Sequence, residues 1–226
     1  QIQKVHITSS KTQTFPTQYN HGIYPPSQLV FLSQKCQNLV MQAENGNSTF
    51  MVAVAQSLMK GINDFPKNIE LAVKYLKCAT DLNNFEAAEL YASLLIKGTI
   101  IPQNYEMARG IVEKLILQET PHAQLLWAEL ELQNPNVNYQ EVKQCLQNMS
   151  SNGSVEAMFL YAQLCILPKE KTNVDPNPIE ARRYIDCIKH SGKEEIISQA
   201  QKFVYDHRKI LDPNQPTTPP PPYYPS

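Results

Sequence analysis

Cysteine is the residue type in this sequence with the widest range of possible chemistry, because its thiolate can bind a metal, form a disulfide or attack a substrate. The cysteines are odd in number and irregular in spacing, with no Cys-x-x-Cys pair and no Cys/His cluster at zinc-site intervals. They are Cys36, Cys78, Cys145, Cys165 and Cys187. Each falls within an apolar helical pattern, which predicts reduced thiols that act as small core residues and no metal site.

Three glycosylation triplets of the form Asn-x-Ser/Thr begin at Asn47, Asn148 and Asn152. Such triplets matter only in a secretory compartment, and an Asn-rich chain generates them by chance. A cytoplasmic location is therefore predicted. The lumen of the secretory pathway is the alternative if the triplets are used.

Catalytic constellations are missing from the sequence. The histidines have no carboxylate or cysteine partner at a recognisable interval, and there is no nucleophile elbow, phosphate loop or His-Glu-x-x-His motif. The histidines are His6, His21, His122, His190 and His207. We predict a protein that is not an enzyme, with no catalytic residue and no bound cofactor.

The end of the chain carries a possible peptide ligand. Pro221, Pro222, Tyr223 and Tyr224 fit the pattern Pro-Pro-x-Tyr, and the same pattern fits again one residue earlier. WW domains bind such segments in the polyproline conformation. The sequence therefore offers a WW-type domain as a partner, and an inert low-complexity tail as the alternative.

Composition bounds the rest of the chain. Twenty Lys and Arg against 21 Asp and Glu give a net charge of −1, which predicts no nucleic-acid partner, and no apolar run is long enough to predict membrane insertion. We expect a flexible polar arm at 1–26, a folded region at 27–211 and a disordered Pro/Tyr-rich tail at 212–226. Because the sequence begins at Gln1 rather than Met, we expect that a region upstream could be missing.

Two registers of the sequence recur at a nearly constant period, which is the mark of a repeat array. In the first, an alanine recurs at spacings of 37, 36 and 34 residues, at Ala55, Ala92, Ala128 and Ala162. In the second, an asparagine recurs at spacings of 36, 34 and 39 residues, at Asn68, Asn104, Asn138 and Asn177. Agreement between two independent registers predicts four structural repeats.

Each repeat is predicted to be two helices joined by a short loop. Asparagine is a favoured helix N-cap, and an acidic residue follows each of the four asparagines within three positions, while Gly61 and Gly98 favour helix ends. The predicted A helices are 48–60, 85–97, 121–133 and 154–167, and the B helices are 69–83, 105–118, 139–151 and 178–191. A helix at 27–44 precedes the repeats and a polar cap helix at 193–209 follows them, which makes ten.

These units resemble the Sel1-like repeat (SLR) family, a relative of tetratricopeptide repeats. The second unit has Ala87, Tyr91, Leu95, Gly98 and Ala108 at the family spacing, and loop lengths favour this family over a strict 34-residue period. Asn replaces the family's usual Asp before every B helix, and the second loop glycine is missing from all four units. The resemblance covers about 45–192, as repeats at 48–83, 85–118, 121–151 and 154–191.

The resemblance implies an all-α fold, a right-handed superhelical solenoid in which Trp127 and its equivalents Tyr91 and Tyr161 belong to the core. It also implies an adaptor or scaffold that binds a peptide or protein surface in a concave groove lined by the A helices. The polar positions expected there are Gln56, Glu89, Glu129 and Gln163. Two alternatives stay open: a regulatory region of a larger enzyme, such as a kinase with its catalytic domain upstream, and a structural subunit of a large assembly.

Overall fold

The computed structural model describes residues 22–120 and 122–212, and all the regular secondary structure within them is helical. They divide into two compact units. Unit 1 extends to Leu94 and includes Thr99–Ile101, and unit 2 comprises Leu95–Gly98 and the chain from Pro102 onward. His6, His21 and the Pro-Pro-x-Tyr segment lie outside the described residues.

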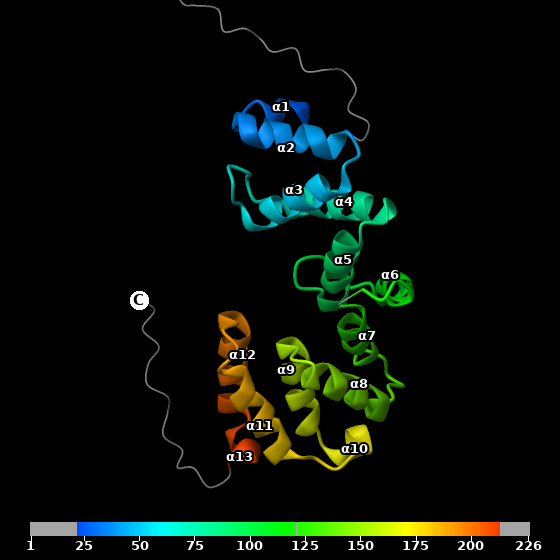
Figure 1. Cartoon of the computed structure of the whole chain (residues 1–226), viewed down its shortest axis with the longest axis vertical. Coiled ribbons are helices and arrows are strands. Elements are labelled where there is room, and N and C mark those ends of the chain that lie inside the picture. The colour runs from blue at the N-terminus through cyan, green and yellow to red at the C-terminus, as the bar shows by residue number, and fades with distance from the viewer. Residues whose placement is uncertain (1–21, 121, 213–226) are drawn as a thin grey trace, which may run out of the picture. The chain divides into compact units, whose positions relative to one another are not determined.

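Unit 1 contains the first helices of the chain (Figure 1). They are α1 (Pro26–Leu29), α2 (Gln34–Glu44), α3 (Ser48–Lys60), α4 (Ile69–Asp81) and most of α5 (Phe85–Lys97). α2 packs on α3, and α3 packs on α4 along most of its length. The α3–α4 pair corresponds to the predicted first repeat.

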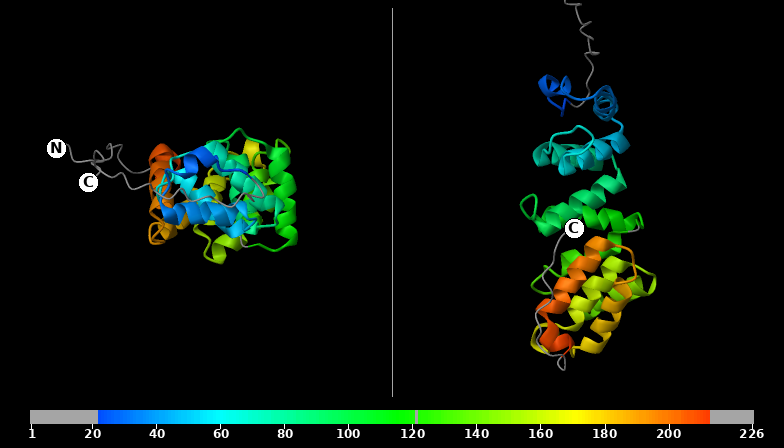
Figure 2. Two further views of the ribbon diagram at one scale, coloured as in Figure 1. Left: turned by 90° about the horizontal axis from the view of Figure 1, so that it is seen from above. Right: turned by 90° about the vertical axis from the view of Figure 1, so that its left-hand side faces the viewer.

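Unit 2 contains the remaining helices. They are α6 (Tyr105–Leu117), α7 (Ala123–Glu131), α8 (Tyr139–Ser151), α9 (Val155–Cys165), α10 (Lys169–Thr172), α11 (Pro178–Ile188), α12 (Glu194–Asp206) and α13 (Arg208–Leu211). Each of α6 to α9 packs on the next, and α9, α11 and α12 lie side by side (Figures 1 and 2). The core of this unit includes Tyr161, Ile185 and Ile188.

The asparagine caps predicted for the B helices are confirmed. The side-chain oxygens of Asn68, Asn104, Asn138 and Asn177 accept a hydrogen bond from the N–H three residues later, at 2.9–3.3 Å. Each bond satisfies an otherwise unpaired donor of the first turn. Gly61 ends α3 in the left-handed conformation, with φ of 67°, and this also agrees with the sequence prediction.

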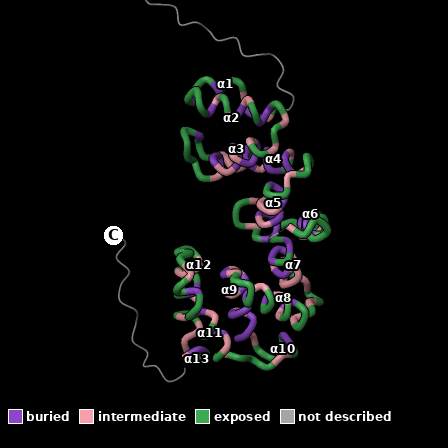
Figure 3. Tube along the Cα trace, viewed as in Figure 1, coloured by how far each residue is buried: buried purple, intermediate pink, exposed green. Residues whose placement is uncertain are grey.

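The repeated alanines lie in the interior of their own units. Ala55, Ala92, Ala128 and Ala162 on the A helices and Ala72, Ala108 and Ala181 on the B helices are all 0% exposed. A methyl group lets two helix backbones approach closely, and a larger side chain would force them apart. In unit 2, α7 is largely buried whereas α6 exposes much of its surface (Figure 3).

Two predicted helices are interrupted. The predicted helix at 27–44 is α1 and α2, because Ser33 takes an extended conformation and begins a new helix, while the Gln37 side chain donates to the carbonyl of Leu32. The predicted cap helix at 193–209 divides at His207 into α12 and α13 and continues to Leu211. The short helix α10 lies in a segment predicted as a loop.

The prediction of core cysteines is wrong for one of the five. Cys36 and Cys165 are buried, and Cys78 and Cys145 are half-buried, but Cys187 is exposed because it lies on the outer face of α11. Burial raises the pKa of the Cys165 thiol to about 11 and also raises the pKa of Cys78 and Cys145. The thiols of Cys78, Cys145 and Cys165 are therefore poor nucleophiles.

Candidate functional site

The two groove positions predicted in unit 1 lie on one polar face. Gln56 of α3 is half-buried and its side-chain amide donates to Glu86 Oε1 of α5 at 3.1 Å. Glu89 is half-buried and follows Glu86 by three residues, so the two carboxylates lie on the same side of α5. Gln56, Glu86 and Glu89 form what we call the α3–α5 strip.

The two groove positions predicted in unit 2 lie on α7 and α9. Glu129 and Gln163 are both half-buried. Burial raises the pKa of the Glu129 carboxyl, and the positive charge of Lys97 acts in the opposite direction. A single groove that joins these residues to the α3–α5 strip stays a prediction.

The aromatic positions of the repeats belong to the packed interior. Tyr91 is 7% exposed and Tyr161 is 1% exposed, while Trp127 is partly buried against the core of unit 2. Tyr161 packs edge-on against Tyr184 with ring centroids 4.9 Å apart. This agrees with the core role that the family resemblance implied for these positions.

A buried carboxylate that the sequence analysis missed fixes the start of the folded region. Glu44 is 1% exposed and accepts hydrogen bonds from the backbone N–H groups of Ile23, at 3.1 Å, and Tyr24, at 2.9 Å, and from the Tyr75 hydroxyl. Burial and the neighbouring Glu44 raise the pKa of Tyr75. These three hydrogen bonds anchor α4 to the chain before α1, and packing begins before the predicted boundary at 26. The available signal was an acidic residue on the apolar face of α2, four residues after Val40.

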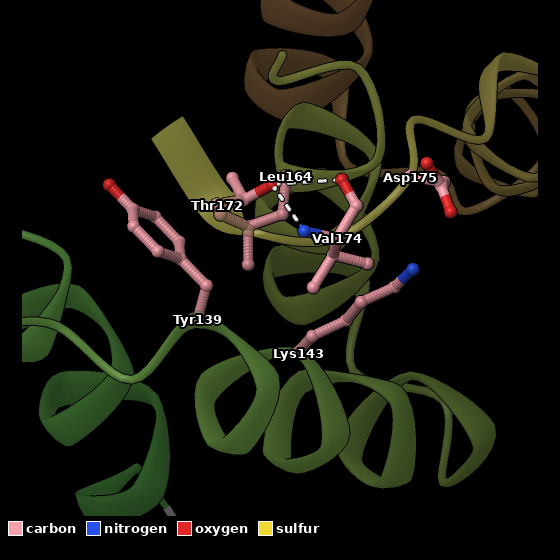
Figure 4. Close-up of a pocket in the computed structure, with 6 residues that line it drawn as sticks. All are labelled: Tyr139, Lys143, Leu164, Thr172, Val174 and Asp175. Carbon is pink, nitrogen blue, oxygen red and sulfur yellow. Dashed lines mark hydrogen bonds between the residues drawn. The ribbon is translucent and has the colours of Figure 1, made fainter. Parts of the chain in front are cut away.

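A small hollow lies between α8 and the loop that follows α10 (Figure 4). Lys143 extends from α8 below this loop, and the Thr172 hydroxyl bonds both the carbonyl and the N–H of Val174, at 3.0 and 3.2 Å. The Lys143 ammonium lies 5.6 Å from the centre of the Tyr161 ring. The hollow has a volume of about 10 Å³, which is room for about one water molecule, so it shapes the loop rather than binding a ligand.

A larger open groove runs along the outer face of α11 and was also missed. We call it the α11 groove; its volume is about 590 Å³ and it is lined by Ile179, Arg182, Arg183, Asp186, Cys187, His190 and Leu211. Ile179 is 85% exposed. The only sequence signal for the α11 groove was Ile179, an isoleucine outside the buried face of an amphipathic helix. The opposite wall, which includes Leu211, depends on how α13 packs against α11.

Within residues 22–120 and 122–212, no three His, Cys, Asp or Glu side chains are grouped in a way that could hold a metal ion. The helices there are too short or too polar to cross a membrane.

Comparison with known proteins shows the fold. No protein-family model and no curated protein sequence matches the chain. A Sel1 repeat protein from Oxalobacter formigenes is similar in structure, with a TM-score of 0.56 and 18% identity over 80% of this chain and 72% of that one. A protective antigen of uropathogenic Escherichia coli with an SLR fold gives a TM-score of 0.53 and 17% identity over 77% of this chain and 37% of that one.

At these identities the similarity concerns the fold. The second protein is much longer, so this chain spans little more than a third of it. The matched proteins agree with the all-helical repeat architecture described above. The chain has the Sel1-like repeat fold.

Proposed function

We propose that this protein is an adaptor or scaffold that binds a peptide or protein surface along the polar faces of its A helices. The observation that carries the proposal is the α3–α5 strip, where an amide and two carboxylates share one accessible face in unit 1. Such groups accept hydrogen bonds from backbone N–H groups or from Lys and Arg side chains. The strip therefore suits a partner segment that presents donors or positive charge.

Lysine substitution on the A helices tests this function, because it reverses the charge at the two Glu positions and adds a positive charge at the two Gln positions. In the full chain we would change Gln56, Glu89, Glu129 and Gln163 to Lys, singly and in pairs within a unit, and identify co-purifying proteins from the source cells by mass spectrometry. Loss of a charge-assisted contact should lower the affinity for the partner about tenfold, which corresponds to about 1.4 kcal/mol of binding free energy.

A matched control is Glu113→Lys on the exposed surface of the B helix α6. It changes the net charge of the chain by the same amount as Glu89→Lys but lies off the A helices. Circular dichroism would confirm that each variant is folded. Retention of every partner by all the A-helix variants would refute the proposal.

We also propose the tail segment Pro221–Tyr224 as a ligand for a WW-type domain. The support is the sequence pattern, since these residues lie outside the described part of the chain. Titration of a WW domain with the full chain should show binding that Tyr223→Ala combined with Tyr224→Ala removes. Equal binding by the variant would exclude the motif.

A cytoplasmic location is proposed as well. The five cysteines are thiols in the structure, which suits a reducing compartment. Expression of the full chain in its source cells, followed by glycosidase treatment, should leave its electrophoretic mobility unchanged. A mobility shift would place the chain in the secretory pathway.

A further inference from the structure

The α11 groove presents apolar surface and a cation that no described residue covers. Ile179 is 85% exposed at one end, and Cys187 and Arg183 are exposed along the wall. Leu211, at 7% exposed, forms part of the opposite wall. An exposed isoleucine beside an exposed guanidinium is a surface on which proline and aromatic side chains pack well.

Ion pairs leave the α11 groove nearly neutral. Arg182 pairs with Asp212, at 2.5 Å between Nη1 and Oδ2, and with Asp186, at 3.6 Å between Nε and Oδ1. Lys189 also pairs with Asp186, at 2.7 Å. Because Arg182 already has two carboxylate partners, Arg183 is the cation with an exposed face. The groove therefore leaves one exposed guanidinium, that of Arg183, on which the face of an aromatic ring can stack.

The pair between Arg182 and Asp212 also sets where the rest of the chain begins. Their side chains are 28% and 19% exposed, and the preceding residue, Leu211, lines the groove. The Asp212 N–H bonds the carbonyl of Arg208 at 2.8 Å, which completes α13. The segment 213–226 is thus joined covalently to a residue fixed at the edge of the α11 groove.

The composition of this segment matches the groove. Residues 213–226 contain prolines, Asn, Gln, Thr, Ser and two tyrosines, and no Asp, Glu, Lys or Arg. In a polyproline conformation fourteen residues would reach about 43 Å. The stretch of α11 from Ile179 to His190 spans roughly 17 Å, so the segment is long enough to lie along it.

We propose that residues 213–226 fold back onto the α11 groove, with prolines packed over Ile179 and a tyrosine ring stacked on the guanidinium of Arg183. A short tether gives an effective concentration on the order of 1 mM. A weak intrinsic affinity, on the order of 0.1 mM, would then keep the groove covered about nine tenths of the time. This contact does not depend on the proposed A-helix function.

Cys187 reports directly on the contact, because it is an exposed thiol within the groove. We would measure its alkylation rate in the full chain by peptide-resolved mass spectrometry, with buried Cys36 and Cys165 as internal references for folding. Tyr223→Ser combined with Tyr224→Ser should speed the alkylation of Cys187 about tenfold and leave the references unchanged. A chain that ends at Asp212 should give the same rate.

Changes on the groove side complete the test. Ile179→Ser should raise the Cys187 rate to that of the tyrosine variant, and adding the tyrosine changes to it should give no further increase. Lys202→Gln, an exposed site on α12 outside the groove, is the control. Equal Cys187 rates in the full chain and the tyrosine variant would overturn the proposal. Protection that grows with protein concentration would also overturn it and would assign the groove to a second copy.

Discussion

The first helix pair, α3 and α4, and the third, α7 and α8, keep the same key positions but close their loops differently. Both have a fully buried alanine on the A helix, Ala55 or Ala128, and an asparagine cap on the B helix. α3 is 13 residues long and ends at a left-handed glycine, whereas α7 is 9 residues long and has no side-chain bond at its N-cap. The alanine and the B-helix cap are therefore the features that both pairs share.

The loop of the first pair is closed by backbone, and that of the third by a polar network. The N–H of Asn68 bonds the carbonyl of Leu58, and the equivalent bonds in the second and fourth repeats reach Leu95 and Cys165. In the third repeat Glu131 occupies the position equivalent to Leu58, Leu95 and Cys165. Its carbonyl accepts a hydrogen bond from the N–H of Asn134, which belongs to the loop itself.

The Glu131 side chain completes that network. Its carboxylate pairs with Arg109 of α6 at 2.8 Å and accepts from the Asn134 amide at 3.2 Å. Side-chain bonds thus replace the backbone closure and the glycine that the third repeat lacks. A repeat of this fold tolerates a changed loop when a neighbouring helix supplies the missing contacts.

The largest difference between the two pairs should appear when their alanines are enlarged. We expect Ala55→Leu to lower the free energy of unfolding by about 3 kcal/mol and Ala128→Leu by about 1 kcal/mol, because α3 packs on α4 more extensively than α7 on α8. Urea unfolding followed by circular dichroism measures both losses, and the fluorescence of Trp127, the single tryptophan, follows the third pair. Equal losses would contradict the difference in packing.

The glycine that ends α3 provides the next test. Gly61→Ala should cost about 1–2 kcal/mol, because φ is +67° and the added Cβ would lie 3.1 Å from Lys67 Cβ. Gly110→Ala in α6 is the matched control, since its Cβ meets no atom within 4 Å and should stabilise the helix by about 0.5–1 kcal/mol. Thermal unfolding of both variants measures the two opposite shifts, and a stabilising Gly61→Ala would show that α3 does not need the left-handed stop.

Removing the Glu131 network that closes the loop of the third repeat should lower the free energy of unfolding somewhat less than the loss of Gly61 does. Glu131→Leu restores the residue type of the first two repeats but removes the bonds to Arg109 and Asn134, so we expect a loss of about 1 kcal/mol. Because Arg109 is 43% exposed, water can solvate it in the variant. Arg109→Leu should cost about the same, and the double variant should cost less than the sum in urea unfolding. Fully additive losses would mean that the pair contributes nothing.

Most of the repeat architecture could be predicted because its signals are local. Asn68 and its equivalents cap the helices they precede, and Gly61 ends the helix it follows, so a few neighbouring residues decide each boundary. The break at Ser33 could not be predicted in this way, because it depends on how Leu29 and Leu32 pack into unit 1.

The Glu44 cluster and the surface sites were less predictable, because they depend on contacts between segments far apart in the sequence. The Glu44 cluster joins residues 20 to 31 positions apart, and the α11 groove exists only because α13 returns to α11. The predicted groove residues were placed on the right helices, but the sequence could not show that Gln56 binds Glu86. Contacts between distant segments leave little trace in a single sequence.

The smallest expected effect concerns Glu129, which stands where the first repeat has Gln56. Burial raises the pKa of this carboxyl in the folded state, so the folded chain binds the proton more tightly than the unfolded chain does. Stability should therefore fall as the pH rises from the ordinary carboxyl range through the raised pKa of the folded state. Glu129→Gln removes the titration, so it should stabilise the protein at pH 7 and leave its stability unchanged at pH 3. Urea unfolding at both pH values measures the difference, and a destabilised variant at pH 7 would show that the attraction of Lys97 outweighs the cost of burial.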